Sequence, residues 1–125
     1  MSNCNLQPES IAYLALGFSA NVSLTKLILS DNISIGKEGI TKLCDALIDN
    51  KKECKLIDLD LAKCNINSDS AKPIIRLMNS NYKLRHINLK DNVIKDDAAT
   101  EMLSALLNYN SYVTRCNLDF NPIRH

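Results

Sequence analysis

The sequence predicts an α/β fold: a right-handed solenoid, or horseshoe, of about four to five repeats, with parallel strands on the concave face and helices on the convex face. Three observations predict it. One apolar pattern recurs, most completely at residues 84–94 (LRHINLKDNVI), with leucine or isoleucine at its first, fourth, sixth and eleventh places and asparagine at its ninth. Asparagine or cysteine holds that ninth place at nearly regular intervals. After each copy except the last comes a segment whose apolar residues have the spacing of one face of a helix.

The ninth-place residues are Cys4, Asn32, Cys64, Asn92 and Asn121, separated by 28, 32, 28 and 29 residues. The long interval contains one extra residue at Ile33–Ile35 and three more at Lys51–Lys55. Residues 1–125 are therefore interpreted as one domain, with repeats at about 1–23 (partial), 24–55, 56–83, 84–112 and 113–125 (partial). A single unit of this size cannot bury its own leucines, so we expect the repeats to stack.

Each repeat is expected to contain a short strand, a turn and a helix. The expected strands lie near Lys26–Leu29, Ile57–Leu61, His86–Leu89 and Arg115–Leu118. The expected helices lie near Pro8–Ser19, Lys37–Asp49, Asp69–Asn79 and Asp96–Asn108. Candidate helix-capping residues precede or open the later helices: Ser68, Asp69, Asp96 and Asp97. Asparagines that tolerate the left-handed conformation follow the helices: Asn21, Asn50, Asn81 and Asn110.

The ninth-place side chain has a predicted structural role. An asparagine amide in a tight turn can bond backbone groups of its own coil and of the neighbouring coil, which would otherwise be buried without partners. Cysteine at Cys4 and Cys64 keeps the size of the side chain and loses most of this bonding.

Composition excludes several classes of function. The net charge of +1 gives no field that would attract nucleic acid or an anionic membrane. Five cysteines without a C-x-x-C pair argue against a disulfide framework and a zinc site, and favour reduced thiols in a cytoplasmic protein. Cys54, in the insertion, is the cysteine expected to be exposed. No apolar run is long enough to span a membrane, no Gly-rich phosphate loop is present, and no cofactor is expected.

The pattern resembles the leucine-rich repeat family, and its period and its alternation of asparagine with cysteine resemble the ribonuclease-inhibitor-like subclass. The matching sets begin at Leu24, Leu56 and Leu84, and a partial set begins at Val113. The subclass includes cytosolic innate-immune receptors, a Ran GTPase-activating protein, and cytoskeletal and ciliary proteins. The resemblance implies a non-enzymatic module that binds protein partners.

Strand residues that point away from the leucines are the candidate partner-binding residues. They are Lys26, Ile28, Asp31, Asp58, Asp60, His86, Asn88, Lys90, Arg115, Asn117 and Phe120. This face is polar, with acidic residues toward its first strands and basic residues toward its last, so charge complementarity with a protein is expected. A lone His86 favours surface hydrogen bonding, and Asp58 and Asp60 favour solvated charges over acid–base chemistry. No nucleophile comes with a base, so no catalytic site is predicted.

A second contact is expected at the carboxyl end. The last repeat would leave an apolar edge around Leu118, Phe120 and Ile123, which a neighbouring chain or a larger assembly could cover. Two alternative functions remain. One is a structural subunit of a cytoskeletal or ciliary assembly. The other is a GTPase-activating or effector-type regulator, which would need arginine or asparagine on turns that here carry Asp31, Lys63 and Lys95.

Overall fold

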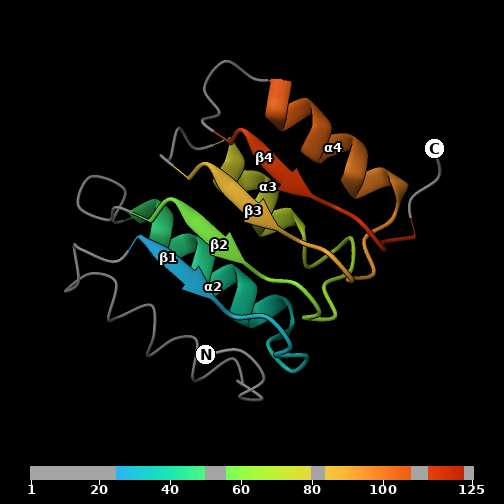
Figure 1. The fold of residues 1–125 in the computed structure, drawn as a ribbon, viewed down its shortest axis with the longest axis horizontal. Helices are drawn as coiled ribbons and strands as arrows, with labels where there is room; N and C mark the ends of the chain where they lie inside the picture. Colours follow the sequence, from blue (N-terminus) through green and yellow to red (C-terminus); the bar gives the residue numbers. More distant parts are fainter. Residues whose placement is uncertain (1–24, 50–55, 80–83, 108–112, 123–125) are drawn as a thin grey trace.

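The computed structural model describes residues 25–49, 56–79, 84–107 and 113–122 (Figure 1). Several sequence predictions lie outside these residues. They concern the helix at Pro8–Ser19, the turn cysteine Cys4, the asparagines Asn21, Asn50, Asn81 and Asn110, the insertion Lys51–Lys55 with Cys54, and Ile123.

The described residues form an α/β solenoid in which strands and helices alternate, as the sequence predicts. The strands are β1 (Lys26–Ile28), β2 (Asp58–Asp60), β3 (His86–Asn88) and β4 (Arg115–Asn117). The helices are α2 (Gly36–Asp49), α3 (Lys72–Met78) and α4 (Asp96–Leu107). The strands form one parallel sheet in the order β1-β2-β3-β4, and the helices all lie on the same side of it (Figure 1).

The core lies between the sheet and the helices. The middle residues of successive strands stand beside one another in register: Leu27, Leu59, Ile87 and Cys116. Leu29, Leu61 and Leu89 follow at the strand ends and are fully buried. The flanking strand residues are more exposed, because side chains alternate between the two faces of a strand. The predicted strands run one to two residues further than the observed ones, which end just before these leucines.

The predicted asparagine ladder is confirmed. Asn92 donates from Nδ2 to the carbonyl oxygens of Leu61 (3.0 Å) and Leu89 (2.9 Å). Its Oδ1 accepts from the backbone N–H groups of Cys64 (3.0 Å) and Ile66 (2.9 Å). Each amide thus joins one coil to the coil before it, and Asn121 repeats the arrangement one coil later. The ladder satisfies backbone groups that the solenoid buries.

Cys64 keeps part of this role. Its Sγ lies 3.1 Å from the carbonyl oxygen of Leu29 in the preceding coil, so the thiol donates where an amide nitrogen would. Burial raises the pKa of the Cys64 thiol to about 11, against smaller opposing effects of backbone hydrogen bonds from Asn32 and Asp31. At neutral pH the thiol is therefore protonated and able to donate.

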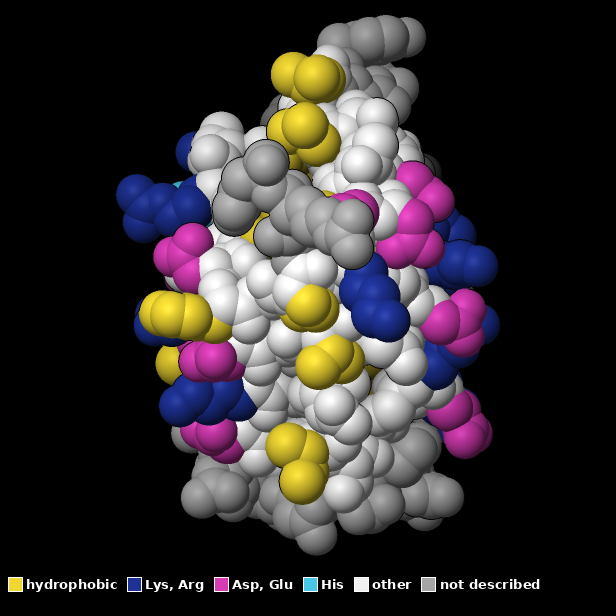
Figure 2. All heavy atoms as spheres, turned by 90° about the vertical axis from the view of Figure 1, so that its right-hand side faces the viewer, with side chains coloured by type: hydrophobic (Ala, Val, Ile, Leu, Met, Phe, Trp, Pro, Cys, Tyr) yellow, Lys and Arg dark blue, Asp and Glu magenta, His cyan; other side chains and the backbone are white. Residues whose placement is uncertain are grey.

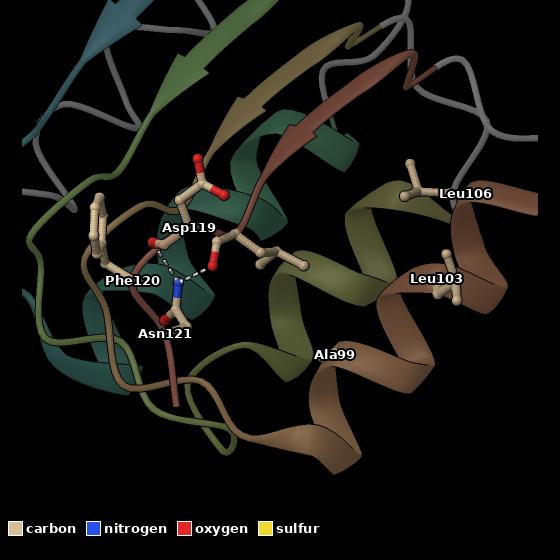
Figure 3. Close-up of a pocket in the computed structure, with 7 residues that line it drawn as sticks. Ala99, Leu103, Leu106, Asp119, Phe120 and Asn121 are labelled. Atoms are coloured by element: carbon tan, nitrogen blue, oxygen red, sulfur yellow. Dashed lines mark hydrogen bonds between the residues drawn. The ribbon is translucent and has the colours of Figure 1, made fainter. Parts of the chain in front are cut away.

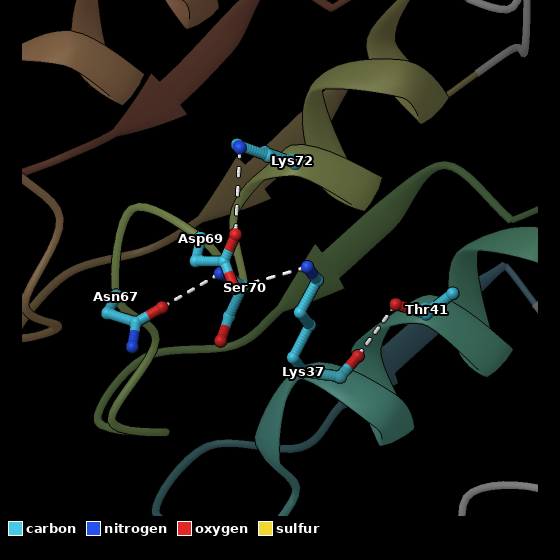
Figure 4. Close-up of polar contacts among 6 residues, drawn as sticks. All are labelled: Lys37, Thr41, Asn67, Asp69, Ser70 and Lys72. Carbon is cyan, nitrogen blue, oxygen red and sulfur yellow. Dashed lines mark hydrogen bonds and ion pairs between the residues drawn. The ribbon is translucent and has the colours of Figure 1, made fainter.

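The predicted capping of the third helix is wrong, whereas α4 begins at Asp96 as expected. α3 begins at Lys72, and its N-cap residue, Ala71, makes no side-chain capping bond. The reason is a separate turn before the helix, which Asn67 closes by accepting the backbone N–H of Ser70 (2.8 Å, Figure 4).

The carboxylate of Asp69 instead joins two helices. It lies 3.1 Å from Nζ of Lys37 on α2 and 3.6 Å from Nζ of Lys72 on α3 (Figure 4). A hydrogen bond and charge attraction from Lys37, with a smaller contribution from Lys72, hold the pKa of Asp69 below its usual value.

Candidate functional site

The register of the sheet brings the candidate residues into two rows on the concave strand face. The first row is Lys26, Asp58, His86 and Arg115; the second row is Ile28, Asp60, Asn88 and Asn117. A shallow hollow of about 270 Å³ lies over these rows and involves all of them except Ile28. Acidic and basic side chains are interleaved along both flanks of the molecule (Figure 2).

The first row carries charges of both signs. Oδ2 of Asp58 lies 3.9 Å from Nζ of Lys26 on β1 and 3.9 Å from Nδ1 of His86 on β3. The carboxylate therefore sits between two basic side chains and is partly compensated by them. Arg115, at the other end of the row, has no ion pair with any residue that the structure describes.

The three polar residues of the second row have a structural role that was not predicted from the sequence. The side-chain oxygens of Asp60, Asn88 and Asn117 accept hydrogen bonds from backbone N–H groups two residues later, at 3.0, 3.1 and 2.9 Å respectively. Each bond closes the turn that leaves its strand, as asparagine and aspartate commonly do. The signal was present in the sequence, because these residue types recur two places before the turn.

A third row, formed by the residue just before each ninth-place residue, has a left-handed backbone. The φ angles are 65° at Asp31, 55° at Lys63, 58° at Asp91 and 60° at Phe120. The left-handed region costs about 1–2 kcal/mol for most residues and is better tolerated by aspartate and asparagine. Phe120 is therefore the least suited of the four to its backbone conformation.

Phe120 combines this backbone conformation with exposure. Its side chain is 72% exposed. Nζ of Lys90, from the preceding coil, lies 5.3 Å from the centre of the ring, within cation–π distance. In Figure 3 the ring points away from Leu103 and Leu106 of α4. The ring and the lysine thus form a common surface at the carboxyl ends of β3 and β4.

A separate apolar groove lies between α4 and the carboxyl end of β4 (Figure 3). Its volume is about 300 Å³, and its lining residues are Ala99, Leu103, Leu106, Leu118, Asp119, Phe120 and Asn121. We call it the C-terminal groove. It matches the apolar edge expected from the sequence at Leu118, but the Phe120 ring is directed elsewhere.

The described residues contain no group of three or more histidine, cysteine, aspartate or glutamate side chains that could hold a metal ion. No helix among them has the length and apolarity to cross a membrane. Burial raises the pKa of the Cys44 thiol to about 12 and that of Cys116 to about 11, so both are protonated at neutral pH. Cys44 is buried in the core, and Cys116 is half-buried against it.

Comparison with known proteins agrees with this geometry. A family model described as "Leucine Rich repeat" matches residues 20–44, 52–74 and 80–103. The chain is 35% identical over 118 residues to mouse "NACHT, LRR and PYD domains-containing protein 5", covering 94% of this chain and 10% of that protein. It is 30% identical over 107 residues to mouse ribonuclease inhibitor, covering 86% of this chain and 23% of that protein. The chain therefore spans less than a quarter of the length of these two relatives.

Two solved structures share the fold. One is the tropomodulin C-terminal domain of Caenorhabditis elegans, with a TM-score of 0.74 and 19% identity, covering 93% of this chain and 66% of that one. The other is leiomodin-1 actin-binding site 2, with a TM-score of 0.70 and 19% identity, covering 94% of this chain and 61% of that one. At this identity the likeness concerns the fold alone. The relatives found by sequence confirm the resemblance to the ribonuclease-inhibitor-like subclass.

Proposed function

Because the chain belongs to the leucine-rich repeat family, we propose that it is a non-enzymatic, cytoplasmic module that binds a partner protein through its concave strand face. The parallel sheet supports this proposal, since it holds two rows of polar side chains in fixed register on one surface. A binding surface needs such pre-organisation, because ordering side chains during association opposes binding.

The single observation that carries the proposal is the state of Phe120. Phe120 is 72% exposed and its backbone has a left-handed conformation, so the residue contributes little to the stability of the fold. Backbone strain of this kind is concentrated at functional sites. Aromatic side chains are also frequent among the residues that dominate binding energy. We therefore assign Phe120 as the apolar anchor of the proposed surface.

The basic side chains around Phe120 indicate which charge a partner segment would carry. Lys90 lies over the ring, and Arg115 stands on the same strand face without an ion pair among the described residues. A partner segment with an apolar side chain beside one or two carboxylates would complement this half of the surface. Such charge pairs influence the rate and specificity of association more than its strength.

The test is affinity capture from native lysate with the wild-type chain and the Phe120→Asn variant. Asparagine suits the left-handed backbone, so the variant removes the ring without disturbing the turn. Ile33→Asn is the matched control, because Ile33 is also a large exposed apolar side chain (65% exposed) but lies outside the strand rows. We expect a specific protein to be lost with Phe120→Asn and kept with Ile33→Asn. An unchanged set of captured proteins with both variants would contradict the proposal.

A second variant tests the charged part of the surface. Asp58→Lys replaces the carboxylate between Lys26 and His86, whereas Asp60 is left intact because its side chain closes a turn.

Co-sedimentation with filamentous actin is a useful further experiment, since one structural neighbour is described as an actin-binding site. Binding to actin that Phe120→Asn abolishes would identify the partner and favour a cytoskeletal role.

A further inference from the structure

The hollow on the strand face has an acidic side and a basic side. Asp58 and Asp60 of β2 line one side of it, and Arg115 of β4 lines the other. Because β3 lies between these two strands, their backbones are about 10 Å apart at the usual spacing of neighbouring strands. No ion pair joins Arg115 to either aspartate among the described residues. Both sides of the hollow therefore keep charges that a bound segment can meet.

The fold does not need the negative charge of Asp60. Its Oδ1 atom accepts the backbone N–H of Ala62 at 3.0 Å and so closes the turn after β2. Asn88 and Asn117 close the corresponding turns with amide oxygens at 3.1 and 2.9 Å, so an uncharged side chain suffices at this place. Asp60 makes no ion pair with any residue that the structure describes. Its charge is therefore available to a partner.

Asp58 belongs to the same side of the hollow, although basic side chains partly compensate its charge. Its Oδ2 atom lies 3.9 Å from Nζ of Lys26 and 3.9 Å from Nδ1 of His86, and all three side chains are partly exposed. Exposed ion pairs of this kind contribute little to stability, so the carboxylate can exchange them for another cation at small cost. Lys26, Asp58 and Asp60 together carry one net negative charge, whereas the opposite side of the hollow is positive through Arg115.

Resting on the proposed function, we propose that the partner segment lies across the strands and carries a basic and an acidic side chain about 10 Å apart. The basic side chain lies over Asp58 and Asp60, and the acidic one meets Arg115. The apolar side chain that contacts Phe120 is then on the acidic side of the segment, because Phe120 follows β4. Reversing the segment would bring like charges together, which is unfavourable, so the surface selects one orientation.

A displayed library of random peptides is the probe for this charge pattern. It is selected on the wild-type chain and counter-selected on the Phe120→Asn variant. We expect the enriched peptides to share a basic and an acidic residue, with an apolar residue beside the acidic one. Enriched peptides without this pair would overturn the inference but leave the proposed function intact, because their binding still depends on Phe120. No enrichment on the wild-type chain would contradict both.

Double-mutant cycles with one enriched peptide show which charge meets which. Asp60→Asn, which keeps an oxygen for the turn bond, should raise the dissociation constant by about threefold, and Arg115→Gln should do the same. Neutralising the basic residue of the peptide should then cost nothing further on Asp60→Asn. Neutralising its acidic residue should cost nothing further on Arg115→Gln. Additive effects within either pair, or coupling of Asp60 to the acidic residue, would overturn the proposed arrangement.

Two control variants make the same chemical changes outside the hollow. Glu101→Gln removes an exposed carboxylate of α4, on the other side of the sheet. Arg85→Gln removes an exposed guanidinium just before β3. Neither residue lines the hollow, so both variants should bind the peptide as the wild-type chain does. Equal losses in the controls and in the hollow variants would show that only the overall charge of the chain matters, which would also overturn the proposal.

Discussion

Four residues, one in each described repeat, share a left-handed backbone at the point where the chain leaves the sheet. Two of them, Asp31 and Asp91, have side chains that tolerate this conformation. Phe120 does not, yet it occupies the same place and exposes its ring. The sequence identifies Phe120 as a candidate contact residue but not as a strained one, because the repeat pattern of leucines carries no information on φ.

Phe120→Asn should stabilise the protein even though it removes a proposed contact residue. Relief of the left-handed strain is expected to raise the free energy of unfolding by about 1 kcal/mol, as urea denaturation would measure. Phe120→Ala is the control, because alanine also lacks the ring but keeps the strain. If both variants have the same stability, the strain at this position is not significant.

The second-row residues also have two roles. Asp60, Asn88 and Asn117 face the hollow and at the same time close their own turns. The sequence predicted their face correctly from strand alternation. The leucine pattern alone does not predict the turn bonds, whereas the recurrence of aspartate or asparagine two places before the turn could have indicated them.

At the scale of elements, asparagine side chains connect each turn to the turn before it. Asn92 bonds carbonyl oxygens and N–H groups of two coils and is buried. This ladder was predictable, because the ninth-place asparagine recurs with the leucines. The start of α3 was not, because Asn67 forms a local turn that competes with the expected caps at Ser68 and Asp69.

Asn92→Ala should destabilise the protein strongly. It leaves the carbonyl of Leu61 and the N–H groups of Cys64 and Ile66 without this partner, whereas Leu89 keeps its bond from Asn121, and each buried unpaired group costs about 1–3 kcal/mol. We expect the free energy of unfolding to fall by at least about 3 kcal/mol. Asn88→Ala removes one turn bond and should cost about 1 kcal/mol. Equal losses for the two variants would contradict the ladder.

The link between α2 and α3 gives a prediction about pH. The lowered pKa of Asp69 means that its carboxylate binds protons less readily in the folded chain than in the unfolded chain. Its contribution to stability is therefore present above the unfolded pKa and is lost as pH falls through the folded pKa. Asp69→Asn should reduce stability at neutral pH and have no effect in strong acid, as thermal melts at both pH values would show. A difference that persists in acid would show that Asp69 acts other than through its charge.

At the scale of the whole molecule, stability comes from contacts between coils. Leu29, Leu59 and Leu89 lie in different coils and belong to one continuous core. The sequence predicted this architecture because the spacing of leucines repeats with the period of the coil.

Hydrogen exchange on the wild-type chain and on Leu59→Ala tests this dependence of each coil on its neighbours most directly. Leu59 is fully buried in the second described strand, and loss of its side chain should cost about 2–5 kcal/mol. The account predicts faster exchange not only at Leu61 but also at Leu29 and Leu89, whose N–H groups bond the adjacent coils. Faster exchange confined to residues 56–79, with Leu29 and Leu89 as protected as in the wild type, would contradict it.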